Sequence, residues 1–107
     1  MGERQHKRVI VNLQAELICG DTRFSGLIEN LSEDGVYLIT TSAKSPIDLA
    51  PNTALELRFQ LPSGEKQSLH CVVKWSYKTP SHGLTSSIGM KIINPPETYK
   101  HSLRTLQ

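Results

Sequence analysis

Apolar and polar residues alternate along most of the chain, and this alternation predicts strands that each bury one face. The first alternating run places five apolar side chains at every second position: Val9, Val11, Leu13, Ala15 and Leu17. Asparagine, glutamine and glutamate occupy positions between them. A period of two residues is typical of a half-buried β-strand, because successive side chains point to opposite faces.

Five further segments have the composition of strands, and turn or loop sequences separate them. They cover residues 24–31, 36–40, 55–61, 68–77 and 86–93. The pair Asp34-Gly35 predicts a tight hairpin turn between two of them, since glycine adopts a positive φ without steric cost. Prolines and small polar residues predict a surface loop over residues 41–54 and another connection over residues 78–83.

The tail after Pro96 has the spacing of a short helix. Tyr99, Leu103 and Leu106 lie three or four residues apart, so they would share one helical face. A helix of about ten residues is marginal in isolation. We therefore expect this segment to be stable only where it packs on the rest of the fold.

Six antiparallel strands at regular spacing favour an all-β protein, and closure into a six-stranded antiparallel β-barrel would remove exposed strand edges. At 107 residues and 11.9 kDa the chain has the size of one domain. We expect a flexible N-terminal arginine segment at residues 1–8, a barrel at residues 9–94 and a helical tail at residues 95–107. The first segment should be mobile because it holds almost no apolar anchor.

The net charge of +2 indicates no general surface for polyanions, so any anion site must be local. A basic cluster of Arg4, Lys7 and Arg8 is one such place. Cys19 and Cys71 lack a C-x-x-C arrangement and are interpreted as reduced, buried thiols. No signal peptide or apolar run of the roughly 20 residues needed to cross a bilayer is present, so we expect a cytoplasmic protein without membrane insertion.

No pattern of catalytic or metal-binding residues is visible in the sequence. The four histidines, His6, His70, His82 and His101, lack the spacing of metal ligands. A Ser-His-Asp arrangement, a paired carboxylate site and a phosphate-binding glycine loop are likewise not recognisable. We therefore expect neither an enzyme nor a metal or cofactor site.

Two short motifs carry the candidate chemistry. Arg4 and Arg8 form an R-x-x-x-R pattern, and Asn30, Ser32 and Gly35 form an N-x-S-x-x-G pattern in the expected turn. Guanidinium groups suit guanine edges and phosphates, because they present paired donors in a plane and keep their charge. This order of motifs resembles the PilZ family of bacterial receptors for cyclic di-GMP. The later segment of residues 88–92, with a glycine in the final strand, resembles the same family.

The resemblance implies the same barrel fold and a cyclic di-GMP ligand bound by both motifs. Arg4 and Arg8 would share the guanine edges and the phosphates, while Asn30 and Ser32 supply hydrogen bonds. Gly35 would serve the backbone, since a side chain there would strain the turn or obstruct the ligand. Trp75 is a further candidate for the wall of the ligand pocket, and its alternative is a large barrel residue without a ligand role.

The expected mechanism is that of a ligand-gated adaptor. Cyclic di-GMP would bridge the arginine segment to the Asn30–Gly35 turn, and the ordered segment would create a surface for a downstream protein partner. Two alternatives remain. One is a PilZ-like protein-interaction module without nucleotide binding, and the other is a small barrel that binds single-stranded nucleic acid. The near-neutral charge and the six aromatic residues argue against a nucleic acid polymer.

Overall fold

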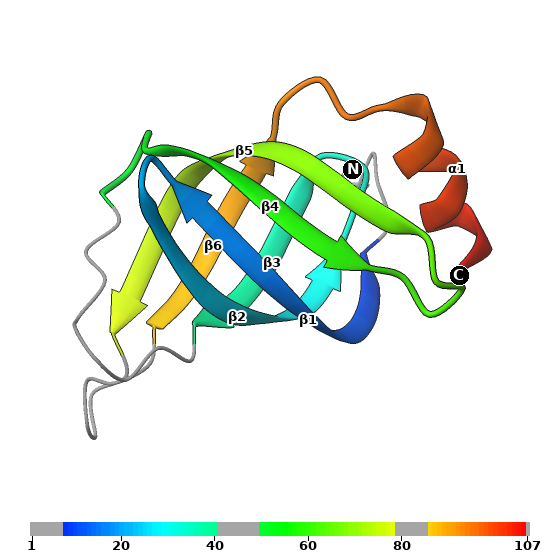
Figure 1. Cartoon of the computed structure of the whole chain (residues 1–107), viewed down its shortest axis with the longest axis horizontal. Coiled ribbons are helices and arrows are strands. Elements are labelled where there is room, and N and C mark those ends of the chain that lie inside the picture. The colour runs from blue at the N-terminus through cyan, green and yellow to red at the C-terminus, as the bar shows by residue number, and fades with distance from the viewer. Residues whose placement is uncertain (1–7, 41–49, 79–85, 107) are drawn as a thin grey trace, which may run out of the picture.

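The strands close into a barrel. The computed structural model describes residues 8–40, 50–78 and 86–106. Within these residues the strands are β1 (Val9–Cys19), β2 (Thr22–Leu31), β3 (Gly35–Thr40), β4 (Ala54–Gln60), β5 (Lys66–Lys78) and β6 (Ser86–Ile92). They form a closed barrel in the order β1-β2-β3-β6-β5-β4, with antiparallel pairing between neighbours (Figure 1). The predicted six-stranded antiparallel β-barrel is confirmed.

The barrel interior is filled by the apolar residues of the alternating patterns. Leu17, Leu38, Leu57, Val73 and Ile88, from five different strands, have no exposed surface. The residues between them on each strand are more exposed, so each strand has an inner apolar face and an outer polar face. Burial of this apolar set is the main favourable contribution to folding.

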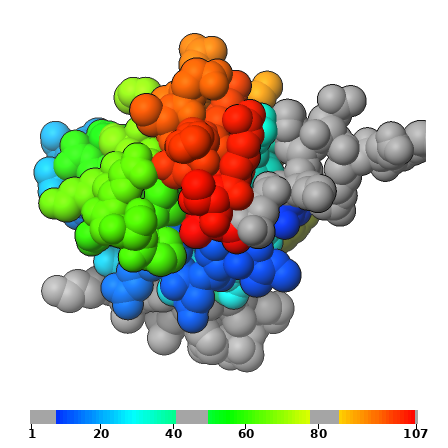
Figure 2. Space-filling model, turned by 90° about the vertical axis from the view of Figure 1, so that its right-hand side faces the viewer, coloured from blue at the N-terminus to red at the C-terminus, as the bar shows by residue number. Residues whose placement is uncertain are grey.

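One end of the barrel is covered by the helix α1 (Glu97–Thr105), which is coloured orange to red in Figures 1 and 2. Tyr99 and Leu103 are buried against the strands, and Leu106 also packs against the core. The predicted helix is confirmed, and packing on the barrel explains how so short a helix is held. The helix is too short and too polar to span a membrane, and no other helix occurs in the described residues.

The register shifts in three strand pairs, β1–β2 between Ile10 and Leu13, β2–β3 and β5–β6, and the last two change which way the side chains of β2 and β5 face. In β2, Ile28 pairs with Leu38 and Asn30 pairs with Tyr37, so Glu29 is an extra residue relative to β3. In β5, Val73 pairs with Met90 and Trp75 pairs with Gly89, so Lys74 is an extra residue relative to β6. These are β-bulges, which interrupt the alternation and redirect side chains.

The turn between β2 and β3 differs from the sequence prediction in one respect. Among the described glycines, Gly20 and Gly64 have a positive φ, whereas Gly35 does not. The expectation that Gly35 provides a left-handed turn residue is therefore wrong. Its lack of a side chain matters for another reason, because a Cβ there would lie 3.2 Å from the Ser32 hydroxyl oxygen.

The remaining predictions on loops and ends are only partly covered by the described residues. Strands β2 and β5 begin two residues earlier than predicted, at Thr22 and Lys66. Most of the expected loop at residues 41–54 and of the connection at residues 78–83 lies outside the described residues. The same holds for residues 1–7, so the predicted flexible segment stays a prediction.

Candidate functional site

The turn that carries the second motif is closed by a backbone hydrogen bond of its own and held by two neighbouring elements, β6 and α1. The Ser32 N–H donates a hydrogen bond to the Gly35 carbonyl at 2.9 Å, which closes the turn. The Ile92 N–H at the end of β6 donates to the Asp34 carbonyl at 2.8 Å. The Tyr99 hydroxyl on α1 donates to the Ser32 carbonyl at 2.6 Å. The turn is therefore fixed to both the sheet and the helix.

The Ser32 side chain is used within this turn. Its hydroxyl oxygen lies 3.3 Å from an Asp34 carboxylate oxygen and 3.4 Å from the Gly35 carbonyl oxygen, and either can accept its proton. The residue is buried. This geometry is the local side chain to backbone bonding that serine often makes in turns.

Asn30 faces outward because of the bulge at Glu29. Its neighbour Leu31 is fully buried, and its cross-strand partners are the exposed Ile10 on β1 and the half-buried Tyr37 on β3. The Nη1 atom of Arg8 donates a hydrogen bond to the Asn30 Oδ1 atom at 3.3 Å. Arg8 of the first motif thus contacts Asn30 of the second motif, although the two residues are 22 positions apart in the sequence.

A pocket of about 400 Å³ lies beside this contact. Its lining includes Arg8 and Gly35 from the two motifs and the candidate wall residue Trp75. Tyr37, Lys74 and Lys91 contribute further side chains to the same lining. The pocket therefore combines aromatic surface with several cationic groups, which is the composition that a nucleotide requires.

Trp75 packs closely against Gly89. A Cβ at Gly89 would come within 3.0 Å of three atoms of the indole, so only glycine leaves room for the ring. The Trp75 ring centroid is 5.5 Å from that of Tyr37 and 5.3 Å from that of Tyr77, and both pairs are tilted. Trp75 remains 37% exposed and Tyr77 67% exposed, so the outer surface of this aromatic row is open for stacking.

The predicted site residues fall into three groups. Arg8, Gly35 and Trp75 line the pocket, and Asn30 contacts Arg8 at its edge. Ser32 lies in the adjoining turn with its side chain directed to that turn. Arg4 lies outside the described residues.

Sequence reasoning missed the pocket residues Tyr37, Lys74 and Lys91. Strand alternation places Tyr37 outward and could have identified it. Alternation from the buried Val73 also places Lys74 outward, whereas the outward position of Trp75 depends on the bulge in β5, which nothing in the local sequence indicates. Lys91 reaches the pocket because β6 lies between β3 and β5, and the local sequence does not indicate this strand order.

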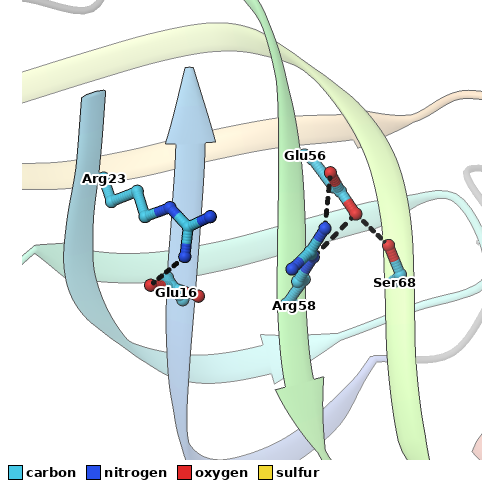
Figure 3. Close-up of polar contacts among 5 residues, drawn as sticks. All are labelled: Glu16, Arg23, Glu56, Arg58 and Ser68. Carbon is cyan, nitrogen blue, oxygen red and sulfur yellow. Dashed lines mark hydrogen bonds and ion pairs between the residues drawn. The ribbon is translucent and has the colours of Figure 1, made fainter. Parts of the chain in front are cut away.

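A second pocket of about 440 Å³ lies over β1, β4 and β5 and contains none of the motif residues. Its surroundings are charge-paired (Figure 3): Arg23 lies 3.6 Å from Glu16, and Arg58 lies 2.9 Å from Glu56. Ser68 also donates a hydrogen bond to Glu56. The hydrogen bonds from Arg58 and Ser68 lower the pKa of the Glu56 carboxyl. Ion pairs of this kind are typical of the solvent-exposed outer face of a barrel.

The described residues contain no group of three or more histidine, cysteine, aspartate or glutamate side chains arranged to hold a metal ion. The side chains that line the pocket, among them Arg8, Tyr37 and Trp75, offer hydrogen bonding, stacking and charge. Such a site can hold a planar, anionic ligand.

Three solved structures illustrate the proteins that share this fold. The Bacillus subtilis inhibitor of motility MotI/DgrA matches with a TM-score of 0.79 and 16% identity, over 99% of this chain and 50% of that chain. The PilZ domain of YcgR from Escherichia coli, solved with c-di-GMP, matches with a TM-score of 0.74 and 12% identity, over 94% of this chain and 86% of that chain. The Borreliella burgdorferi PlzA protein in complex with c-di-GMP matches with a TM-score of 0.64 and 16% identity, over 94% and 49%.

This chain therefore spans about half the length of MotI/DgrA and of PlzA. At these identities the structural matches establish a shared fold. No curated protein sequence is significantly similar to the chain. The sequence model of the PilZ domain, in contrast, matches residues 3–106, which is nearly the whole chain. The chain belongs to the PilZ domain family.

Proposed function

We propose that this PilZ domain is a receptor for cyclic di-GMP that acts as an adaptor and not as an enzyme. Arg4 and Arg8 would bind the ligand together with the turn of Asn30, Ser32 and Gly35. The observation that carries the proposal is the contact between Arg8 and Asn30 at the edge of a pocket walled by Trp75. The ligands of the YcgR and PlzA structures support the choice of nucleotide.

The chemistry of the pocket matches the parts of this ligand. A guanidinium group can donate two hydrogen bonds to O6 and N7 of one guanine, a contact that discriminates by about 1–3 kcal/mol. The open surface of Trp75 offers a flat aromatic face on which a purine can stack. The arginines also supply positive charge for the two phosphates.

Ligand binding would order the N-terminal segment and so produce the signal. Within the described residues, the Arg8 side chain is joined to the barrel by a long hydrogen bond of 3.3 Å to the neutral amide of Asn30. Such a bond contributes little and is readily exchanged for stronger bonds to an anion. The segment of residues 1–8 would then lie on the barrel as a new surface, which a downstream protein partner recognises.

Calorimetry with cyclic di-GMP tests the receptor function. The wild-type chain is expected to bind, and Arg8→Ala should weaken binding by about fivefold to 150-fold, the loss of one bidentate contact. Arg23→Ala is the matched control, because Arg23 is an exposed arginine that pairs with Glu16 outside the pocket. Absence of binding to the wild type would favour the interaction module without nucleotide, and equal losses in both variants would refute the role of Arg8.

Amide NMR tests the ordering step separately. On addition of cyclic di-GMP, the signals of residues 4–8 and 30–35 should shift, and the dynamics of residues 4–8 should slow. Shifts confined to residues 30–35 would mean that the ligand binds without ordering the segment, which would contradict the adaptor mechanism.

A further inference from the structure

Two lysines stand on the barrel wall of the same pocket and belong to neither motif. Lys74 is on β5 and Lys91 is on β6, and both side chains are exposed. No ion pair joins either ammonium group to an acid within the described residues, whereas Lys100 on α1 pairs with Glu97 at 3.5 Å. The two charges are thus available to a ligand of the pocket.

The sheet register explains why both lysines face this pocket. Lys91 is opposite Gly35 on β3, so it lies next to the motif turn. On its other side Lys91 is opposite Val72 on β5. Lys74 is the extra residue of the bulge in β5, directly before Trp75. Bulges commonly occur where a strand must aim a side chain at a binding site.

The charge of the pocket wall is positive as a whole. The ionisable side chains that line it, among the described residues, are Arg8, Lys74, Lys91 and the acid Asp34. The Asp34 carboxylate lies within hydrogen-bonding distance of the Ser32 hydroxyl, in the turn. Three cations against one carboxylate form a suitable site for an anion, and a lysine acts on a phosphate as a compact point charge.

We propose that Lys74 and Lys91 form a fixed phosphate-binding wall on strands β5 and β6, which binds a phosphate of the cyclic dinucleotide. This inference rests on the proposed function. It assigns separate roles to the pocket residues: the barrel strands supply the two lysines and the Trp75 ring, and Arg8 supplies the guanidinium group. The barrel side should therefore retain weak binding even when Arg8 is removed.

The test compares Lys74→Gln, Lys91→Gln and the double variant with wild type in calorimetry with cyclic di-GMP at several NaCl concentrations. Each single variant should weaken binding by about threefold to tenfold, the range for a partly exposed charged contact. The double variant should also show a smaller dependence of affinity on salt, because fewer charge contacts remain to be screened. Trp75→Leu serves as a comparison that weakens binding without reducing the salt dependence.

Lys66→Gln is the matched control, since Lys66 is an exposed lysine on the same strand that lines the other pocket. Losses for Lys74→Gln and Lys91→Gln that merely equal the loss for Lys66→Gln would indicate a general field effect and overturn the proposal. Unchanged affinity in the double variant would also overturn it. If the wild type does not bind cyclic di-GMP at all, the proposed function itself fails, so the two failures are distinguishable.

The background of Arg8→Ala gives an independent measurement. Adding Lys74→Gln and Lys91→Gln to Arg8→Ala should remove the residual binding. Residual binding that is unaffected by the added substitutions would contradict the fixed wall. Thermal unfolding of each variant confirms that the barrel is folded, and no large change is expected because exposed substitutions of this kind usually have small effects on stability.

Discussion

The hydroxyl of Tyr99 donates a 2.6 Å hydrogen bond to the backbone carbonyl of Ser32, and this bond connects the C-terminal helix to the motif turn. Tyr99 is only 1% exposed, so both partners are removed from water. The position of the turn therefore depends on a residue 67 positions further along the chain.

Tyr99→Phe should destabilise the protein, because it leaves the buried Ser32 carbonyl without its partner. We expect the free energy of unfolding to fall by about 1–3 kcal/mol. For a domain of this size each kcal/mol corresponds to a decrease of roughly 4–8 °C in Tm. Tyr77→Phe is the control, since Tyr77 is largely exposed and should be nearly neutral. Equal Tm values for wild type and Tyr99→Phe would contradict this assignment.

Stability should also decrease at alkaline pH through Tyr99. Burial raises the pKa of the Tyr99 phenol well above its ordinary value of 10. The folded state therefore favours the protonated phenol. The stability that this phenol contributes is fully present below pH 10, and it is lost at higher pH because the phenol of the unfolded chain ionises there. Urea unfolding of wild type and Tyr99→Phe between pH 8 and 11 measures this effect. The difference in the free energy of unfolding between the two proteins should become smaller above pH 10.

Gly89→Ala should displace Trp75 from the barrel wall, because the added methyl group and the indole cannot occupy the same space. We expect a destabilisation of about 1–3 kcal/mol, as for other overpacked sites, and weaker binding of cyclic di-GMP. When Trp75→Leu is already present, Gly89→Ala should lower the free energy of unfolding much less, since the smaller leucine side chain can move away. A double-mutant cycle on unfolding free energies checks this, and additive effects would contradict the packing of Trp75 on Gly89.

The outer charged face predicts an acid dependence of stability. The pKa of Glu56 is lowered by its hydrogen bonds from Arg58 and Ser68, so the carboxylate stabilises the folded state above the ordinary pKa of 4.5. This contribution is lost as the pH falls through the lowered pKa in the folded state. Measured from pH 7 to pH 3, the Tm of wild type should exceed that of Glu56→Gln by an amount that decreases in acid. A Tm difference that stays constant over this range would show that it does not arise from the titration of Glu56.

The two thiols should differ in reactivity. Burial raises the pKa of Cys71 to about 12, and the residue is almost inaccessible. Cys19 is half-buried, with its Sγ atom 3.7 Å from the Ala54 carbonyl oxygen. At pH 8, iodoacetamide should modify Cys19 first and Cys71 only after unfolding. Mass spectrometry of native and urea-treated protein measures this, and rapid modification of Cys71 in the native protein would contradict its burial.

The barrel was predictable because its strands alternate with few interruptions. Val9 and Leu17 face inward as the pattern indicates, and Tyr99 and Leu103 pack as a helical pair should. The residues that fill the barrel interior follow from the two-residue period and the hydrophobicity of the strands, which are local properties of the sequence. The fold was therefore accessible without knowing which strands are neighbours.

The pocket was less predictable because its residues meet through strand order and bulges. The residue types and spacing of the two motifs identified Arg8 and Gly35, and both residues line the pocket. Lys91, however, is next to Gly35 only because β6 pairs with β3, and such long-range pairing is not encoded in a local pattern. The positive φ predicted for Gly35 is also wrong, and what distinguishes glycine there is the tight space beside Ser32, whose hydroxyl oxygen would lie 3.2 Å from a Cβ.

The extra residue at Glu29 has a consequence for comparing members of the family. Deleting Glu29 would let Ile28 and Asn30 follow one another opposite Leu38 and Tyr37, so Asn30 and Leu31 would keep their present facings. Inserting or deleting a residue between Asn30 and Ser32 would instead change the spacing of the motif itself. A one-residue gap at Glu29 in a sequence alignment is therefore compatible with an unchanged site, because the bulge absorbs it.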